Sequence, residues 1–204
     1  MTSLVRSPFR VLAWLRRSRA VHPAGRTFTA TVRRAPACPS WVPIEDGIAT
    51  VRFSRGAGLP TRWPDVLGIA IRLPGEWDVL VASTARGLLP WPARSWRSAR
   101  FGTITPYTRG GRRFRFGVEV TDARLGHGDP ERLTGQLPTS ATLILGDGTP
   151  VAVIAVDRPA EDVTFDPMLH HPRDMRMAPR WLARLRELAY AGSRWGRREF
   201  PRGH

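Results

Sequence analysis

The stretch VLGIAIRLPGEWDVLVAS, residues 66–83, decides the fold class of this sequence. Its two halves, 66–73 and 77–83, are rich in β-branched residues, and apolar side chains recur in them with a period of two. Pro74 and Gly75, which favour turns, stand between the halves. Alternation bounded by turn residues is the pattern of a β-strand that buries one face. The stretch therefore predicts two consecutive strands.

Six further segments show the same kind of pattern, with Gly, Pro and Asp residues between them. The sequences RGG (109–111) and DGT (147–149) are typical of hairpin turns, because Gly and Asp tolerate positive φ angles. No helical periodicity separates the strands. The sequence therefore predicts a mainly antiparallel, eight-stranded β-barrel. The six additional strands are predicted at 28–34, 48–54, 100–107, 112–123, 140–147 and 150–157.

Helical patterns are confined to the two ends of the chain. Ser7 is a suitable N-cap and Pro8 suits the first helical position, so the first residues predict a basic amphipathic helix. Its apolar run is too short, and too often interrupted by Arg, for a secretory signal or a membrane span. Near the other end, residues 178–200 show helical spacing, with Pro179 in the first turn. The expected organisation is an N-terminal helix (1–18), the barrel (19–157, with a polar loop at 124–139) and a C-terminal helical extension (158–204).

The composition is that of a folded and strongly basic protein. Of the 204 residues, 42% are hydrophobic and 24% are charged, which argues against a disordered chain. The single Cys38 rules out an internal disulfide, which suits a reducing cytoplasm. The formal net charge is +15, and all 32 basic residues are Arg, which indicates a coding bias. Such a field attracts nucleic acid, anionic membrane surfaces, and phosphate or carboxylate ligands.

Three separated blocks of the sequence resemble the catalase superfamily. The first is RAVH (19–22), which resembles the Arg-x-x-His segment ahead of that family's first barrel strand. The second is VRFSRGAGLPTRWPDVLGIAIRLPGEWDVLVAS (51–83), which is similar to the family's Arg-Phe-Ser, Asp-x-x-Gly and Trp-Asp strands in the same order. The third comprises Arg186, Tyr190 and Arg197, which have the spacing of the family's heme-ligating Tyr and its flanking Arg residues.

The resemblance implies that heme b is the cofactor and that Tyr190 binds its iron. A Tyr binds ferric iron as the phenolate, although its ordinary pKa is about 10. A guanidinium beside the oxygen favours the anion, and Arg186 shares a helical face with Tyr190 because four residues make about one turn. By the same resemblance, Arg19, Arg52 and Arg197 would pair with the carboxylates of the heme.

The resemblance also implies peroxide chemistry. His22 would take a proton from the iron-bound peroxide oxygen and return it to the outer oxygen, acting as base and then acid. Ser54 would hold the His ring in the right tautomer through a hydrogen bond. The family's Asn donor falls at Ser83, whose hydroxyl is shorter than an amide. The aromatic run that walls the family's pocket is missing after Thr84. These departures predict a slow peroxidase acting on hydrogen or organic peroxide.

Other interpretations of the same residues stay open. One is a catalase-like barrel without heme, or one that binds heme passively. Another is an Arg-rich protein whose terminal helices bind nucleic acid or an anionic membrane surface. The segment RRFRFGVEV (112–120) interleaves Arg with aromatic residues, as RNA-recognition strands do, but its alternation also fits a barrel core. The adjacent His170 and His171 form only a weak metal-binding signal. Gly68 indicates a close approach between backbones.

Overall fold

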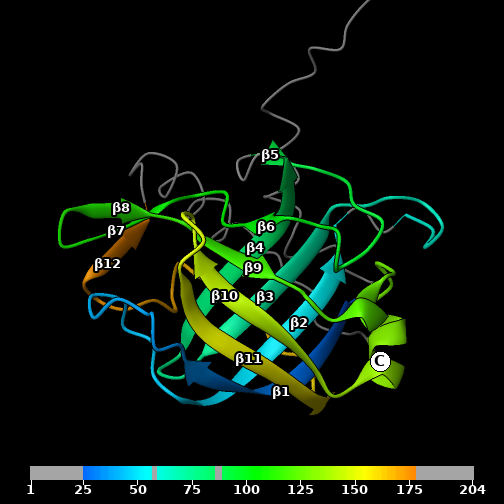
Figure 1. Ribbon diagram of the computed structural model, residues 1–204, viewed down its shortest axis with the longest axis horizontal. Coiled ribbons are helices and arrows are strands. Elements are labelled where there is room, and N and C mark those ends of the chain that lie inside the picture. The colour runs from blue at the N-terminus through cyan, green and yellow to red at the C-terminus, as the bar shows by residue number, and fades with distance from the viewer. Residues whose placement is uncertain (1–24, 57–58, 86–88, 178–204) are drawn as a thin grey trace, which may run out of the picture.

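The computed structural model describes residues 25–56, 59–85 and 89–177. Eight strands in this part of the chain form a closed antiparallel barrel (Figure 1). Their order is β1–β2–β3–β4–β6–β9–β10–β11, and β11 pairs with β1 to complete the ring. The predicted mainly β fold with an eight-stranded antiparallel barrel is therefore confirmed. The barrel strands are β1 (Gly25–Arg34), β2 (Gly47–Arg55), β3 (Leu67–Leu73), β4 (Trp77–Ala85), β6 (Phe101–Gly102), β9 (Phe116–Glu119), β10 (Thr139–Leu145) and β11 (Pro150–Pro159).

Both predicted hairpin turns are present. Gly110 and Gly111 have φ angles of 53° and 77° and join β7 (Tyr107–Arg109) to β8 (Arg112–Phe114). Gly148, with a φ of 90°, lies in the turn between β10 and β11. Residues with a Cβ atom rarely adopt these left-handed angles, so Gly fixes the place of each turn.

Two of the predicted strands are each divided between two sheets, which corrects the sequence interpretation. Residues 100–107 contribute β6 to the barrel and β7 to a separate small sheet, and residues 112–123 are divided in the same way between β8 and β9. The guanidinium of Arg115 sits at this division and donates to the carbonyl oxygens of Thr103, at 2.8 Å, and of Ile104. These bonds satisfy backbone acceptors that leave the barrel ladder where the chain changes sheets.

The predicted polar loop at 124–139 contains two short 3₁₀ helices, η1 (Ala123–Leu125) and η2 (Glu131–Gln136). Each one buries a single apolar side chain, Leu125 or Leu133. A lone apolar anchor in each turn leaves no periodic pattern, which explains why the sequence suggested only a loop.

The expected terminal helices lie outside the described residues, but part of the C-terminal extension is described and is not helical. Strand β11 continues to Pro159, and β12 (Met175–Met177) pairs with β7 at the edge of the small sheet. The remaining short strand, β5 (Leu89–Pro90), pairs with the end of β4. Within the described residues no helix has the length and apolar character needed to cross a bilayer.

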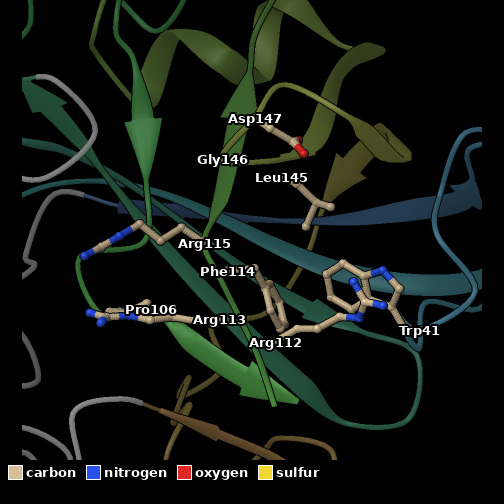
Figure 2. A pocket seen from close by; sticks show the side chains of 9 residues that line it. All are labelled: Trp41, Pro106, Arg112, Arg113, Phe114, Arg115, Leu145, Gly146 and Asp147. Carbon is tan, nitrogen blue, oxygen red and sulfur yellow. The ribbon is translucent and has the colours of Figure 1, made fainter. Parts of the chain in front are cut away.

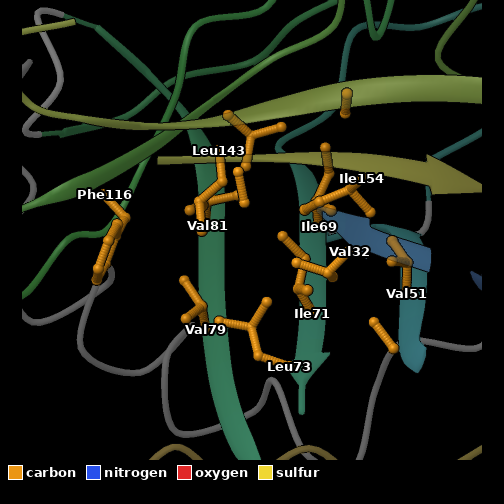
Figure 3. Close-up of a cluster of buried hydrophobic side chains, with 14 of the residues drawn as sticks. Val32, Val51, Ile69, Ile71, Leu73, Val79, Val81, Phe116, Leu143 and Ile154 are labelled. Carbon is orange, nitrogen blue, oxygen red and sulfur yellow. The ribbon is translucent and has the colours of Figure 1, made fainter. Parts of the chain in front are cut away.

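The core fills the inside of the barrel with alternate residues of neighbouring strands (Figure 3). Val51 of β2 faces Ile71 of β3, which faces Val79 of β4, and all three are almost fully buried. Because directly opposite residues share a face of the sheet, the intervening positions of these strands point to the outer face. The alternation between inner and outer faces therefore decides which of the predicted site residues lie on the same face of the barrel.

Candidate functional site

A row of small residues crosses four neighbouring strands on the outer face of the barrel. Gly25 of β1 faces Ser54 of β2, which faces Gly68 of β3, which faces Ala82 of β4. The position before Ser54 is the buried core residue Phe53, so the row lies on the opposite, outer face. We call these four residues the small-residue row. No side chain in it extends beyond a Ser hydroxyl.

The row continues past β4 through Gly102 of β6 and Gly117 of β9, each facing its predecessor across the sheet. Glycine leaves the backbone of a strand uncovered and is found where another group approaches closely. Here an added Cβ at Gly68 would lie 3.0 Å from the Ser54 hydroxyl, and one at Gly117 would lie 2.8 Å from the carbonyl oxygen of Phe101. At Gly68 the close neighbour is the Ser54 side chain, and the nearest backbone atoms lie 3.9 Å away, so the approach there is not the one between backbones that the sequence suggested.

Arg52 borders this row on the same face, two positions before Ser54. A Cβ added at Gly25 would lie 2.6 Å from a terminal nitrogen of its guanidinium. The Arg52 side chain is 15% exposed and forms an ion pair with Asp162, whose side chain is 65% exposed. Arg52 also contacts the Thr27 hydroxyl at 3.4 Å. Burial lowers the pKa of Arg52 from its ordinary value, but a guanidinium remains charged in proteins. The row therefore has a fixed cation at one edge.

Two predicted site serines lie on opposite faces of the barrel wall. The Ser54 hydroxyl lies in the small-residue row and donates to the Gly68 carbonyl oxygen at a long distance of 3.4 Å. Ser83 shares the inner face with Val81; its hydroxyl donates to the Trp91 carbonyl oxygen at 2.6 Å and accepts from the Leu67 N–H at 3.0 Å. The long bond leaves the Ser54 hydroxyl able to rotate toward another partner, whereas the Ser83 hydroxyl is held by two internal bonds. The structure does not bring the two serines together.

The other predicted heme-site residues fall outside the described part of the chain. They are Arg19, His22, Arg186, Tyr190 and Arg197. The described members of the predicted set are therefore Arg52, Ser54 and Ser83. Of these, only Arg52 and Ser54 share a face.

Asp78, from the Trp-Asp motif, is fully buried and organises a loop on the outer face. Arg72 donates to both of its carboxylate oxygens, at 2.8 and 2.9 Å, and the pairing raises the pKa of Arg72. The Asp166 N–H donates to the same carboxylate at 2.6 Å, and the His170 ring nitrogen Nδ1 lies 2.9 Å from it. Asp78 therefore fixes the segment around His170 against the barrel.

Asp65, from the Asp-x-x-Gly motif, is also buried and structural. It accepts from the N–H groups of Leu59, at 3.2 Å, and Val66, at 2.7 Å, and pairs with buried Arg55 at 3.6 Å. Among the described residues no three His, Cys, Asp or Glu side chains are grouped as a metal site would require. His170 therefore serves the Asp78 cluster and not a described metal centre.

The sequence interpretation missed the counter-ion of Arg52. Asp162 is 110 residues away in sequence and lies in a segment without periodicity, so no local signal identifies it. The row beyond Gly68 was missed as well, because only strand register reveals that Gly102 and Gly117 extend it. Comparison with protein-family models and with curated proteins finds no match for this chain.

Proposed function

We propose that the protein binds heme b over the small-residue row, on the outer face of the barrel, and processes peroxides there as a slow peroxidase. The observation that carries this proposal is the meeting of a row of Gly, Ser and Ala with the Arg52 cation, whose guanidinium lies beside Gly25 at one end of the row. Heme combines a flat, mainly apolar macrocycle with two carboxylates. A surface without protruding side chains suits the ring, and a guanidinium suits a carboxylate.

Asp162 supports the assignment of Arg52 as a carboxylate-binding residue. Its carboxylate already pairs with the guanidinium, which shows the kind of anion that this position accepts. The carboxylate is largely exposed and also accepts from the Thr27 hydroxyl, so a ligand carboxylate would have to replace both the ion pair and this bond. Arg52 would then hold one heme carboxylate in place of Asp162.

The resemblance to catalases supplies the remaining roles. His22 lies three residues before Gly25 in the sequence, and three residues span at most about 11 Å, so the chain enters β1 near the row. Tyr190 would bind the iron, with Arg186 favouring its phenolate form, and Arg19 and Arg197 would pair with carboxylates. Bound heme would supply the iron centre at which a peroxide is activated. His22 would carry the proton between the peroxide oxygens.

Ser54 is suited to position the His22 ring. Its hydroxyl lies in the row and, among the residues that the structure describes, bonds only to the Gly68 carbonyl oxygen at 3.4 Å, so it can turn to a nearer partner at little cost. Ser83 plays no part in this proposal, because both of its bonds are made inside the barrel.

The proposal is tested by titrating purified apo-protein with heme and recording the absorbance spectrum. We expect saturation at one heme per chain, with the spectrum of tyrosinate-ligated ferric heme, and loss of that spectrum in Tyr190→Phe. Peroxide turnover by the wild type should fall at least about 100-fold in His22→Ala, because a positioned acid–base group contributes that much. Equal, loose binding by the wild type and Tyr190→Phe would overturn the proposal and favour a heme-free barrel.

A further inference from the structure

An open, positively charged groove lies beside the barrel, at the end opposite Asp65 (Figure 2). Its walls are the β8–β9 segment, the turn between β10 and β11, and the loop that carries Trp41. Its volume is about 690 Å³. It shares no residue with the small-residue row. The residues that line it are Trp41, Pro106, Arg112, Arg113, Phe114, Arg115, Leu145, Gly146 and Asp147.

Three of these residues are cations, and Asp147 is the one acidic residue among them. The Arg115 guanidinium is bound to backbone carbonyl oxygens, whereas Arg112 and Arg113 are exposed and, within the described residues, their guanidinium groups make no hydrogen bond or ion pair. Burial and the nearby charge of Arg113 lower the pKa of Arg115. Both guanidinium groups of the exposed pair are therefore available to an anion, in a field that already repels further cations.

The groove also has an aromatic floor. Trp41 and Phe114 pack edge to face with ring centroids 4.9 Å apart, and the Arg112 guanidinium lies over the Trp41 ring at 5.8 Å. In Figure 2, Arg112 lies on the Trp41 side of Phe114, and Arg113 and Arg115 lie on the Pro106 side. Cations thus flank a stacking surface on two sides. This combination is the one by which proteins hold single-stranded nucleic acids.

We propose that this groove binds single-stranded nucleic acid. Arg112 and Arg113, which extend to opposite sides of β8, would pair with phosphates on either side of a base that stacks against Trp41 and Phe114. A single strand is favoured over a duplex, because the aromatic surface lies inside a concave groove and reaches only an unstacked base. It is favoured over a membrane surface, because the apolar rings are recessed between the Arg side chains and do not protrude from the protein.

The test measures fluorescence anisotropy of a labelled oligothymidine of about 12 nucleotides, a typical single-strand site size. We expect saturable binding that weakens steeply with salt, and at least about a 10-fold weaker affinity in Arg112→Gln/Arg113→Gln. The matched control is Arg94→Gln/Arg97→Gln, which removes the same charge from two exposed residues near Asp65. It should change the affinity by less than about threefold.

A second arm separates stacking from charge. Trp41→Leu should weaken binding to oligothymidine by about fivefold or more, but should leave binding to an abasic strand with the same phosphates unchanged. Three results would overturn the proposal: an equal loss in both double variants, an equal effect of Trp41→Leu on both strands, or no wild-type binding to the strand despite binding to anionic phospholipid vesicles. The heme titration is independent of every one of these outcomes.

Discussion

Two neighbouring regions of the molecule use arginine in opposite ways. Arg34, at the end of β1, donates four hydrogen bonds of 2.8–3.0 Å to carbonyl oxygens of the loop that follows it. The guanidinium of Arg112, beside the same loop, lies over Trp41 and makes no hydrogen bond to any residue that the structure describes. Arg34 stabilises the loop, and Arg112 packs over a residue of that loop, Trp41, in the groove. The positive charge is therefore divided between guanidinium groups that hold the fold and groups that are exposed at the surface.

Arg52 stands between these two extremes. It is half-buried beside the small-residue row, yet its counter-ion Asp162 is mostly exposed and can be exchanged. A guanidinium held in place by its surroundings would need little reorganisation to pair with the ligand carboxylate that we propose. The arginines thus differ in how fully the protein itself satisfies them, and substitutions at these ion pairs and hydrogen bonds should differ in effect accordingly.

Replacement of the buried Arg55 by Met should have the largest effect. Arg55 is 1% exposed, donates to the Gly128 carbonyl oxygen at 3.1 Å and neutralises buried Asp65. Its removal leaves an uncompensated buried carboxylate, so we expect the free energy of unfolding to fall by about 3–5 kcal/mol in chemical denaturation. The double variant Arg55→Met/Asp65→Asn should recover part of this loss. A single variant as stable as the wild type would contradict a structural role.

Arg34→Met should have the next largest effect. Four carbonyl oxygens lose a donor at once, and we expect the free energy of unfolding to fall by about 2–4 kcal/mol. Since the loop carries Trp41, affinity for oligothymidine should fall as well, although Arg34 does not line the groove. Chemical denaturation and anisotropy on the same sample check both effects. If Arg34→Met lowered the free energy of unfolding but left the affinity for oligothymidine unchanged, the loop would not contribute to binding in the groove.

Asp122→Ala should have a smaller effect that depends on pH. Asp122 caps η1 through the Arg124 N–H at 2.9 Å and accepts from the Thr139 hydroxyl at 2.8 Å. Its bonds with Arg124 hold the pKa of the carboxyl well below its ordinary value of 3.8. A lowered pKa stabilises the folded state above the ordinary value, and this contribution disappears as the pH falls through the folded value. Asp122→Ala should therefore cost about 1 kcal/mol near neutral pH, and the difference from wild type should shrink below about pH 4.

Asp162→Asn should have the smallest effect on stability and should raise the affinity for heme. The exposed ion pair contributes under about 1 kcal/mol, so denaturation should barely change. Removing the competing charge should tighten heme binding about two- to fivefold, as measured by absorbance titration. Weaker heme binding in this variant would contradict the exchange of Asp162 for a ligand carboxylate.

Period-two alternation was sufficient to predict the barrel, because each strand buries one face. It also contained the information that separates Ser54 from Ser83. Ser83 is an even number of positions from the core residues Val79 and Val81, whereas Ser54 directly follows the core residue Phe53. A shift of one residue places a side chain on the other face, so motif position alone could not give this result.

The features that remained hidden depend on long-range pairing. The Arg52–Asp162 ion pair joins residues 110 positions apart. The small-residue row and its extension through Gly102 and Gly117 form only because six strands pair in a particular register. The division of the strand at Arg115 depends on carbonyl groups of a different segment. None of these contacts produces a local sequence pattern, so only the three-dimensional structure reveals them.

The most direct test of the central claim is a heme titration of Gly68→Val beside Ala155→Val. Gly68→Val places a branched side chain in the middle of the small-residue row, whereas Ala155→Val places the same branched side chain on the outer face of β11, where a Cβ is already present. We predict that heme binding is lost in Gly68→Val and kept in Ala155→Val, while the far-UV circular dichroism of both variants matches that of the folded wild type. Unchanged heme binding by a folded Gly68→Val protein would contradict the claim that the row holds the heme.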